Sequence, residues 1–231
     1  MTSRPLVAIV RFPGSNDDRD AAWALGAVGA RTALVWHAED ELPPRTGAVV
    51  LPGGFSYGDY LRVGAIASRA PIMAAVRRFA EEGGPVLGIC NGFQVLCEAR
   101  LLPGVLRPNR QLEFLCRDVA VTVESTASPF LRRCVEGQEL VLPVKHGDGA
   151  WYADEGTFMQ LAARGQIVLR YREDVNGSLG RVAGVTNEAG NVMGLMPHPE
   201  HAVDPLLGSA DGGLLLSALV DAAEKHVLAA A

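Results

Sequence analysis

The chain has no long hydrophobic run. Of its 231 residues, 48% are hydrophobic, yet no apolar stretch approaches the ~20 residues that a membrane-spanning helix needs. The apolar stretch near the N-terminus is too short for a signal-peptide core, and no small-residue cleavage site follows it. We therefore expect no membrane association, a cytoplasmic location, and a single α/β domain over residues 1–231.

Positive charge is also scarce. The chain has 21 Lys and Arg against 26 Asp and Glu, a formal net charge of -5. Lysine occurs only at Lys145 and Lys225. Because such a chain has no broad basic surface to neutralise phosphates, we expect no nucleic-acid partner.

Cysteine is sparse and is not spaced as in a metal site. No two of Cys90, Cys97, Cys116 and Cys134 form a Cys-x-x-Cys pair, and their separations match no common zinc pattern. The sequence also lacks a P-loop and a dinucleotide-binding glycine fingerprint. We expect no metal and no cofactor in this chain. A buried, reduced thiol is the default interpretation of each cysteine, and only the neighbours of Cys90 argue against it.

The first half of the chain alternates apolar runs with helical patterns. Strands are expected at 6–10, 32–36, 48–51 and 85–89, and helices after a cap at Ser15 or Asn16, over 66–82 and over 91–99. Strand runs that are apolar throughout are buried on both faces. With helices between them, these runs predict a parallel sheet with right-handed crossovers.

The second half has a different pattern. Strand-like segments at 114–123, 139–144, 166–172, 181–186 and 191–196 are separated by turn signals, and a helix is expected over 213–228. Asn176-Gly177 and residues 188–190 are the expected hairpin turns. No linker separates the halves. We predict an α/β fold with a mostly parallel central sheet flanked by helices and an antiparallel portion in the second half.

One strand-to-helix turn carries a candidate nucleophile. Gly88 and Gly92 flank Cys90 in a Gly-x-Cys-x-Gly arrangement between the strand at 85–89 and the helix at 91–99. This arrangement is the cysteine counterpart of the nucleophile elbow, whose sharp turn leaves no room for neighbouring side chains. A helix N-terminus and a nearby imidazole would favour the thiolate. The bland alternative is a tight turn around a buried cysteine.

Two further segments favour an active site. Gly53 and Gly54 follow a predicted strand, where their backbone N–H groups could approach an oxyanion, although a plain β-turn explains them alone. His198-Pro-Glu200 also follows a strand and could supply a base and its orienting group, with a surface turn as the alternative. All three features lie at the carboxyl ends of strands, where open α/β folds place their sites.

At these residues the sequence resembles the class I, or triad, glutamine amidotransferases, which have a flavodoxin-like fold. The narrower resemblance is to the glutaminase subunits of phosphoribosylformylglycinamidine synthase, and it runs nearly end to end. The stretches that carry it are RFPGSN (11–16), GGFSYGDYLR (53–62), GICNGFQ (88–94), FLCR (114–117), His146-Gly147 and GLMPHPE (194–200).

The resemblance implies a catalytic role for three residues. Cys90 would attack the glutamine carboxamide and form a γ-glutamyl thioester. His198 would deprotonate the thiol and then protonate the leaving ammonia, while Glu200 orients the imidazole.

The resemblance also implies which residues bind the substrate. Backbone at Gly54 and Asn91 would form the oxyanion hole, and Gly53 would be a further substrate-binding residue. Gln94 and the backbone near Gly147 would hold the glutamine.

The implied partners are other subunits of one complex. A large synthetase subunit would use the ammonia, with ATP and Mg, to convert formylglycinamide ribonucleotide to formylglycinamidine ribonucleotide in purine biosynthesis. A small third subunit would bridge the two. This chain would need no cofactor of its own.

A few positions depart from the pattern of the resembled family. Lys145-His-Gly-Asp-Gly149 stands where A-H-G-E-G is expected, Asp174-Val-Asn-Gly-Ser178 where N-P-N-G-S is expected, and His201 where arginine is expected. None belongs to the triad. Asp148 keeps the charge of the expected glutamate with a shorter reach, and Lys145 adds a charge beside the expected glutamine site.

Three other functions remain open from sequence. A stand-alone cysteine hydrolase of γ-glutamyl substrates would use the same nucleophile and base without a partner. The stretch at 53–62 argues against that hydrolase, because it is longer than an oxyanion loop needs and suits a surface docked on a synthetase. A glutaminase subunit for another pathway is disfavoured by the subfamily stretches. A binding-only protein would have no need of Cys90, His198 and Glu200 together.

Overall fold

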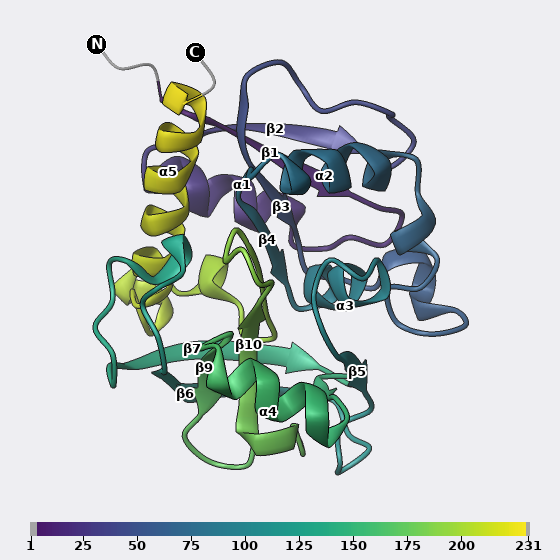
Figure 1. Ribbon diagram of the computed structural model, residues 1–231, viewed down its shortest axis with the longest axis vertical. Helices are drawn as coiled ribbons and strands as arrows, with labels where there is room; N and C mark the ends of the chain where they lie inside the picture. The colour runs from purple at the N-terminus through teal and green to yellow at the C-terminus, as the bar shows by residue number, and fades with distance from the viewer. Residues whose placement is uncertain (1–3, 230–231) are drawn as a thin grey trace.

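The computed structural model describes residues 4–229, and one nine-stranded sheet runs through both halves in the order β2-β1-β3-β4-β11-β10-β9-β6-β7 (Figure 1). Its strands are β1 (Leu6–Arg11), β2 (Arg31–Trp36), β3 (Thr46–Leu51), β4 (Val86–Ile89), β6 (Leu115–Val123), β7 (Glu139–His146), β9 (Ile167–Tyr171), β10 (Val182–Thr186) and β11 (Val192–Leu195). The helices are α1 (Asp18–Ala27), α2 (Ile72–Glu81), α3 (Asn91–Glu98), α4 (Glu155–Ala163) and α5 (Gly212–Ala229).

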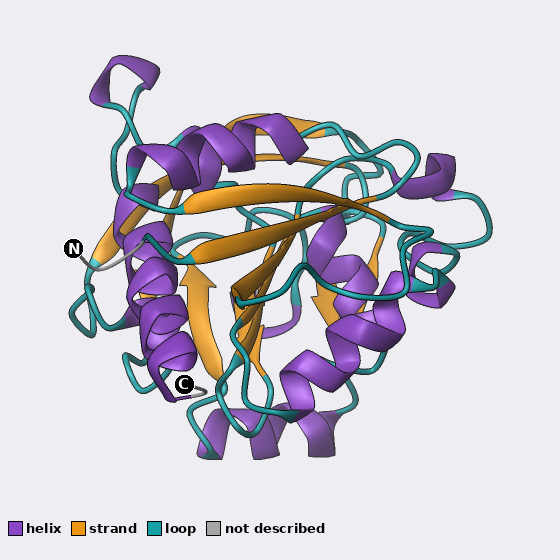
Figure 2. Cartoon of the chain, turned by 90° about the horizontal axis from the view of Figure 1, so that it is seen from above, coloured by secondary structure: helices purple, strands orange, loops and turns teal. Residues whose placement is uncertain are grey.

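The parallel part of the sheet comprises β2, β1, β3, β4 and β11. Every residue of β3 and β4 is buried, as their uninterrupted apolar sequences predict. Helices lie on both sides of the strands (Figure 2). Helix α1 packs on β1 and β2, α5 packs on β3 and β1, and these two helices contact each other, while α3 packs on β3, β4 and β11.

The antiparallel part comprises β10, β9, β6 and β7 and lies below the parallel strands in Figure 1. Alternate residues of β7 are buried, so one face of this part meets the core and the other is more exposed. A separate two-stranded ribbon pairs β5 (Val105–Arg107) with β8 (Ala150–Tyr152).

The return of β11 to the parallel part positions the candidate site. After its antiparallel hairpin with β10, β11 pairs in parallel with β4, with Gly194 opposite Gly88. The carboxyl ends of β4 and β11 therefore lie side by side. Cys90 follows the first of these ends and His198 follows the second.

The predicted fold class is confirmed, with corrections at particular elements. The predicted helix over 66–82 is wrong, because Pro71 separates a 3₁₀ turn at Ala67–Arg69 from α2. The predicted cap at Ser15 or Asn16 is also wrong. Asp17 holds the N-cap position, and the Ser15 hydroxyl instead accepts a hydrogen bond from the Phe12 N–H at 2.9 Å.

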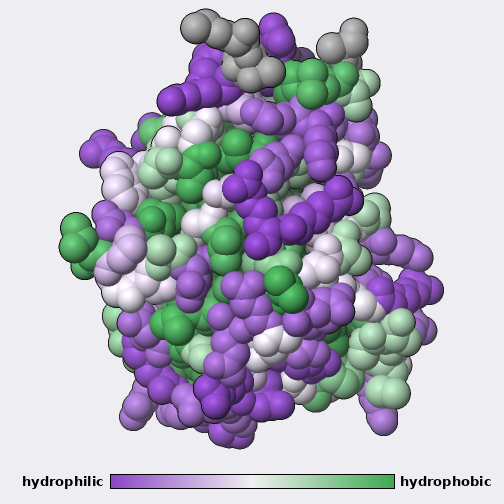
Figure 3. Space-filling model, turned by 90° about the vertical axis from the view of Figure 1, so that its left-hand side faces the viewer, coloured by the Kyte–Doolittle hydropathy of each residue, from purple (hydrophilic) through white to green (hydrophobic). Residues whose placement is uncertain are grey.

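Within residues 4–229, no helix is long and apolar enough to cross a membrane. The side of the molecule that carries α5 shows hydrophilic and hydrophobic residues interspersed over its surface (Figure 3).

Candidate active site

Cys90 occupies a strained turn between β4 and α3. Its φ is +50° and its ψ is -105°, a conformation that side-chain-bearing residues rarely adopt. A Cβ on Gly92 would overlap the carbonyl oxygen of Leu51, and one on Gly88 would approach the Gly92 backbone to 2.7 Å. The two flanking glycines are thus required by close packing of α3 against the sheet. The turn has the geometry of a nucleophile elbow.

His198 and Glu200 lie beyond the end of β11, within hydrogen-bond reach of each other. His198 Nδ1 is 2.6 Å from Glu200 Oε1, and both residues are buried. The His198 backbone N–H donates to the Pro143 carbonyl at 2.8 Å, which ties this segment to β7. Burial disfavours the imidazolium, but the negative charges of Glu200 and Cys90 outweigh burial and raise the pKa of His198 to about 10.

The thiol and the imidazole form one electrostatic unit. Within the described chain, His198 Nε2 is buried without a hydrogen-bond partner, so it is available to take a proton. The Cys90 thiol donates instead to the carbonyl oxygen of Lys145, with Sγ 3.8 Å from that oxygen. A rotation of the thiol toward Nε2 would complete the nucleophile–base pair.

The Gly53-Gly54 segment packs against the loop that follows β1. The N–H groups of Asn16 and Asp17 both donate to the Gly53 carbonyl, at 3.1 and 3.2 Å. Gly54 has a φ of +142°, and a Cβ there would come within 2.6 Å of the Asn16 nitrogen. The Asn91 N–H lies in the first turn of α3, where helical N–H groups have no intrahelical acceptor.

The predicted glutamine-binding residues join α3 to the loop between β7 and β8. Asn91 Nδ2 donates to Gln94 Oε1 at 2.7 Å, and Gln94 Nε2 donates to the Asp148 carbonyl at 2.7 Å. The Gly147 carbonyl accepts the Asn109 N–H at 2.8 Å. Because the Gln94 amide is already hydrogen-bonded at both ends, it would have to exchange a protein partner for a ligand.

Sequence reasoning missed Asp17, which it interpreted only as part of a helix start. Asp17 is 3% exposed, and its Oδ2 lies 3.6 Å from His198 Nδ1. A Cβ on Gly53 would overlap Asp17 Oδ2 and would meet His198 Cε1 at 2.7 Å. Apart from its position directly after the RFPGSN stretch, no sequence signal connects Asp17 with His198.

His146 was also missed as a member of the site wall. Its Nδ1 lies 2.9 Å from Asn109 Oδ1, and its Nε2 is buried without a partner in the described residues. Burial, together with the charge of His198, lowers the pKa of His146 to about 4. The buried Tyr171 hydroxyl is also unpartnered there, and burial and the charge of Cys90 raise its pKa.

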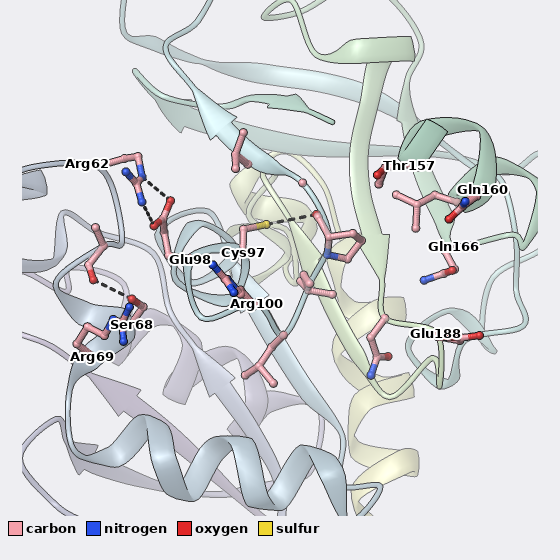
Figure 4. Close-up of a pocket in the computed structure, with 18 of the residues that line it drawn as sticks. Arg62, Ser68, Arg69, Cys97, Glu98, Arg100, Thr157, Gln160, Gln166 and Glu188 are labelled. Atoms are coloured by element: carbon pink, nitrogen blue, oxygen red, sulfur yellow. Dashed lines mark hydrogen bonds and ion pairs between the residues drawn. The ribbon is translucent and has the colours of Figure 1, made fainter. Parts of the chain in front are cut away.

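The triad is closed to solvent. Cys90 is 4% exposed, His198 0% and Glu200 1%. A hollow of about 1380 Å³ lies elsewhere in the molecule, and none of the triad residues lines it. Figure 4 shows Arg62 and Glu98 on one side of this hollow and Thr157 and Gln160 on the other. In this conformation the approach of a substrate to Cys90 is therefore narrow.

One cluster in the site has the spacing of a cation site. Donor atoms of Asp17, His198, Glu200 and His201 lie within 4.8 Å of one another. The Lys145 ammonium already lies among them, 2.6 Å from Asp17 Oδ1 and 3.0 Å from His201 Nε2. We therefore assign the positive charge of this cluster to Lys145 and assign no metal ligands.

Comparison with known proteins gives the class first. Residues 4–211 match the CobB/CobQ-like glutamine amidotransferase domain. The chain belongs to this family of glutamine amidotransferases.

The particular subfamily follows from the curated relatives. Phosphoribosylformylglycinamidine synthase subunit PurQ of Rubrobacter xylanophilus is 56% identical over 217 residues, covering 94% of this chain and 98% of the relative. The subunit PurQ of Thermus thermophilus is 54% identical over 212 residues, covering 89% and 93%. Within the amidotransferases, the chain is a member of the PurQ subfamily.

Solved structures agree. A chain in the structure of PurLQS from Thermotoga maritima superposes with a TM-score of 0.87 at 42% identity, covering 94% of this chain and 98% of that one. A second glutamine amidotransferase from Thermotoga maritima has a TM-score of 0.61 at 20% identity, covering 95% of this chain and 98% of that one. The second likeness shows the fold alone.

Proposed function

We propose that this chain is the glutaminase subunit of a phosphoribosylformylglycinamidine synthase. It hydrolyses glutamine to glutamate and ammonia, and a synthetase subunit uses the ammonia to convert formylglycinamide ribonucleotide to formylglycinamidine ribonucleotide in purine biosynthesis. The observation that carries the proposal is the meeting of Cys90 with His198 and Glu200 at the ends of two adjacent parallel strands. The identity of the curated relatives supports the choice of pathway.

The chemistry starts with transfer of the Cys90 proton to His198 Nε2. The thiolate attacks the carboxamide carbon of glutamine, and the N–H groups of Gly54 and Asn91 stabilise the oxyanion. When the C–N bond breaks, the His198 imidazolium gives its proton to the leaving nitrogen, which departs as ammonia. Water, deprotonated by His198, then attacks the γ-glutamyl thioester and releases glutamate and the free thiol.

Each supporting group has a definite task. Glu200 Oε1 accepts a hydrogen bond from the His198 Nδ1–H at 2.6 Å, which fixes the ring with Nε2 directed to the reaction. The strained backbone at Cys90 keeps the sulfur out of the core. We assign Gly53, Gln94 and the Gly147 backbone to the glutamine pocket, since their hydrogen bonds and packing border the elbow.

The proposed partners are a large synthetase subunit and a small bridging subunit. Tyr60 and Leu61, in the stretch at 53–62, are 75% and 92% exposed, and apolar side chains exposed to this degree suit a docking surface. Phe55 and Phe114 add further exposed aromatic area, with ring centroids 6.3 Å apart. The closed triad supports a site that opens for glutamine only when the partner docks.

The remaining assignments concern cofactors, domain and compartment. ATP and Mg belong to the synthetase partner, and this chain acts as one amidotransferase domain, an assignment supported by the sheet that both halves share. All four cysteines are free thiols. A cysteine nucleophile must stay reduced, which supports the cytoplasm as its compartment.

Glutamine hydrolysis with and without the synthetase subunit and its nucleotide substrates tests this function. We expect low activity alone and strong stimulation in the complex, because the closed site needs docking to open. Appreciable turnover alone, unchanged by the partner, would instead identify a free-standing hydrolase of γ-glutamyl compounds.

A further inference from the structure

Two carboxylates compete for one imidazole N–H in this site. His198 Nδ1 lies 2.6 Å from Glu200 Oε1 and 3.6 Å from Asp17 Oδ2. Both carboxylates are buried, and the ring has a single Nδ1–H to donate. If Asp17 accepted that hydrogen bond in place of Glu200, the ring would turn away from the orientation in which Nε2 meets the Cys90 sulfur. The site therefore needs a positively charged group that pairs with Asp17.

The Lys145 side chain is placed to be that group. Its ammonium lies 2.6 Å from Asp17 Oδ1, on the oxygen that does not face His198. His201 Nε2 lies 3.0 Å from the same ammonium and 3.5 Å from Asp17 Oδ1. The Lys145 backbone carbonyl accepts from the Cys90 thiol at 3.8 Å. One residue of β7 thus contacts the nucleophile through its backbone and the competing carboxylate through its side chain.

We propose that Lys145 is a positioning residue, which neutralises Asp17 so that the His198 Nδ1–H keeps its hydrogen bond to Glu200 and the local charge around Cys90 stays balanced. This inference deepens the proposed glutaminase function and rests on it. Asp17 belongs to the loop after β1, Lys145 to β7 and His198 to the segment after β11. The contacts among these three residues therefore link three strands of the sheet.

The charges around His198 account for the balance. The groups that face it are Cys90 from the elbow, Asp17 from the loop before α1, Lys145 and His146 from β7, and Glu200 and His201 from its own turn, with Asp20 of α1 3.9 Å from His201 Nε2. Burial favours the neutral form of Asp17. The His201 hydrogen bond and the charges of His198 and Lys145 outweigh burial and hold the Asp17 pKa well below its usual range.

Substitutions that remove charges of opposite sign should therefore shift the pH at which the Cys90 thiolate forms in opposite directions. Lys145→Met leaves an unbalanced negative charge beside Cys90, which disfavours the thiolate, so its formation moves to higher pH. Asp17→Asn leaves an unbalanced positive charge, so thiolate formation moves to lower pH. A unit charge at this range shifts such a midpoint by roughly one pH unit. The double substitution restores the balance, and Lys145→Arg conserves it.

The test is the pH dependence of Cys90 alkylation by iodoacetamide in the full chain, followed on the Cys90 peptide by mass spectrometry. Cys116, which is exposed, serves as the internal control in each sample. We expect the Cys90 midpoint to move up in Lys145→Met, down in Asp17→Asn, and back to the wild-type value in the double variant and in Lys145→Arg. Glutamine turnover in the complex should fall about tenfold near neutral pH in Lys145→Met and recover in the double variant.

Shifts of the same sign in both single variants, or no shift, would overturn the proposal. A merely structural Lys145 would lower stability without producing opposite midpoints or rescue by Asp17→Asn. If Lys145→Met does not fold, the acid shift expected of Asp17→Asn decides the question alone. Alkylation needs neither glutamine nor a partner. Failure of the proposed function would therefore appear separately, as a wild-type complex that does not turn over glutamine.

Discussion

The two parts of the sheet contribute differently to one site. The central parallel strands β4 and β11 are buried and apolar, and polar residues appear only beyond their ends, as at His198, where the candidate nucleophile Cys90 also lies. The antiparallel strand β7 is apolar over residues 140–144 and ends in Lys145 and His146, and the Lys145 carbonyl lies 3.8 Å from the Cys90 sulfur. We therefore propose that the parallel part supplies the reacting groups and that β7 of the antiparallel part supplies a charge and a hydrogen bond beside them.

Two buried histidines, one from each part of the sheet, differ in their pKa. Both are at most 2% exposed, yet the pKa of His198 is raised to about 10 and that of His146 is lowered to about 4. His198 faces the Glu200 carboxylate, whereas His146 faces the neutral Asn109 amide. At nearly equal burial, the charge of the neighbouring groups decides the direction in which each histidine pKa moves.

The largest expected effect comes from removing the nucleophile. Cys90→Ala should abolish glutamine-dependent synthesis by the complex, because no other group in the site can form the thioester. Ammonia-dependent synthesis should be unchanged, since it uses only the synthetase partner. Assays with glutamine and with ammonium salts check both halves of the expectation, and loss of both activities would contradict this division of labour.

The next effect separates the two histidines by matched substitutions. His198→Gln should lower glutamine turnover roughly 10²–10⁴-fold, the usual contribution of general acid–base catalysis. His146→Gln should lower it far less, since glutamine can still donate to Asn109 Oδ1. Turnover of both variants in the complex checks this ranking. Near-wild-type activity of His198→Gln would remove that residue from the mechanism.

A packing effect should distinguish the two parts of the sheet. Gly92→Ala would drive a Cβ into the Leu51 carbonyl and destabilise the fold by roughly 1–3 kcal/mol. Gly147→Ala, beside the antiparallel part, meets only Phe114 Cδ2 at 3.9 Å and should change stability by less than about 0.5 kcal/mol. Urea unfolding of both variants measures the difference. Equal losses would show that the elbow is not tightly packed.

The last effect concerns the pH dependence of stability and appears only over part of the acid range. The pKa of His146 falls from 6.5 to about 4 on folding. The unfolded chain therefore binds a proton first, and this residue destabilises the fold as pH falls from 6.5 to 4. His146→Gln should flatten the loss of unfolding free energy over this range by at most roughly 3 kcal/mol. Urea unfolding across that window tests it, and an unchanged slope would contradict a neutral buried His146.

The sequence predicted the parallel part well because its signals are local. Uninterrupted apolar runs marked β3 and β4, and the glycines at 88 and 92 marked the turn at Cys90. The strands of the antiparallel part were also predicted, within a few residues of their ends. The pattern of His198-x-Glu200 is equally local, so these two residues could be paired before their distance was known.

The missed features depend on contacts between distant segments. Asp17 and Lys145 meet only because β1, β3, β4 and β11 end at one edge of the sheet and β7 folds back toward it. An aspartate at a helix start is common, so nothing local marked it as a partner of His198. The missed α4 is short and mostly exposed, and β5 and β8 have only three residues each.

We propose that the two parts of the sheet together make Cys90 a nucleophile toward glutamine. Rapid acid quenching of the complex during turnover, followed by mass spectrometry of the chain's peptides, tests it most directly. We expect a glutamyl adduct on the Cys90 peptide in the wild type and none in Cys90→Ala. An adduct on another residue, or glutamine turnover without any adduct on Cys90, would contradict it.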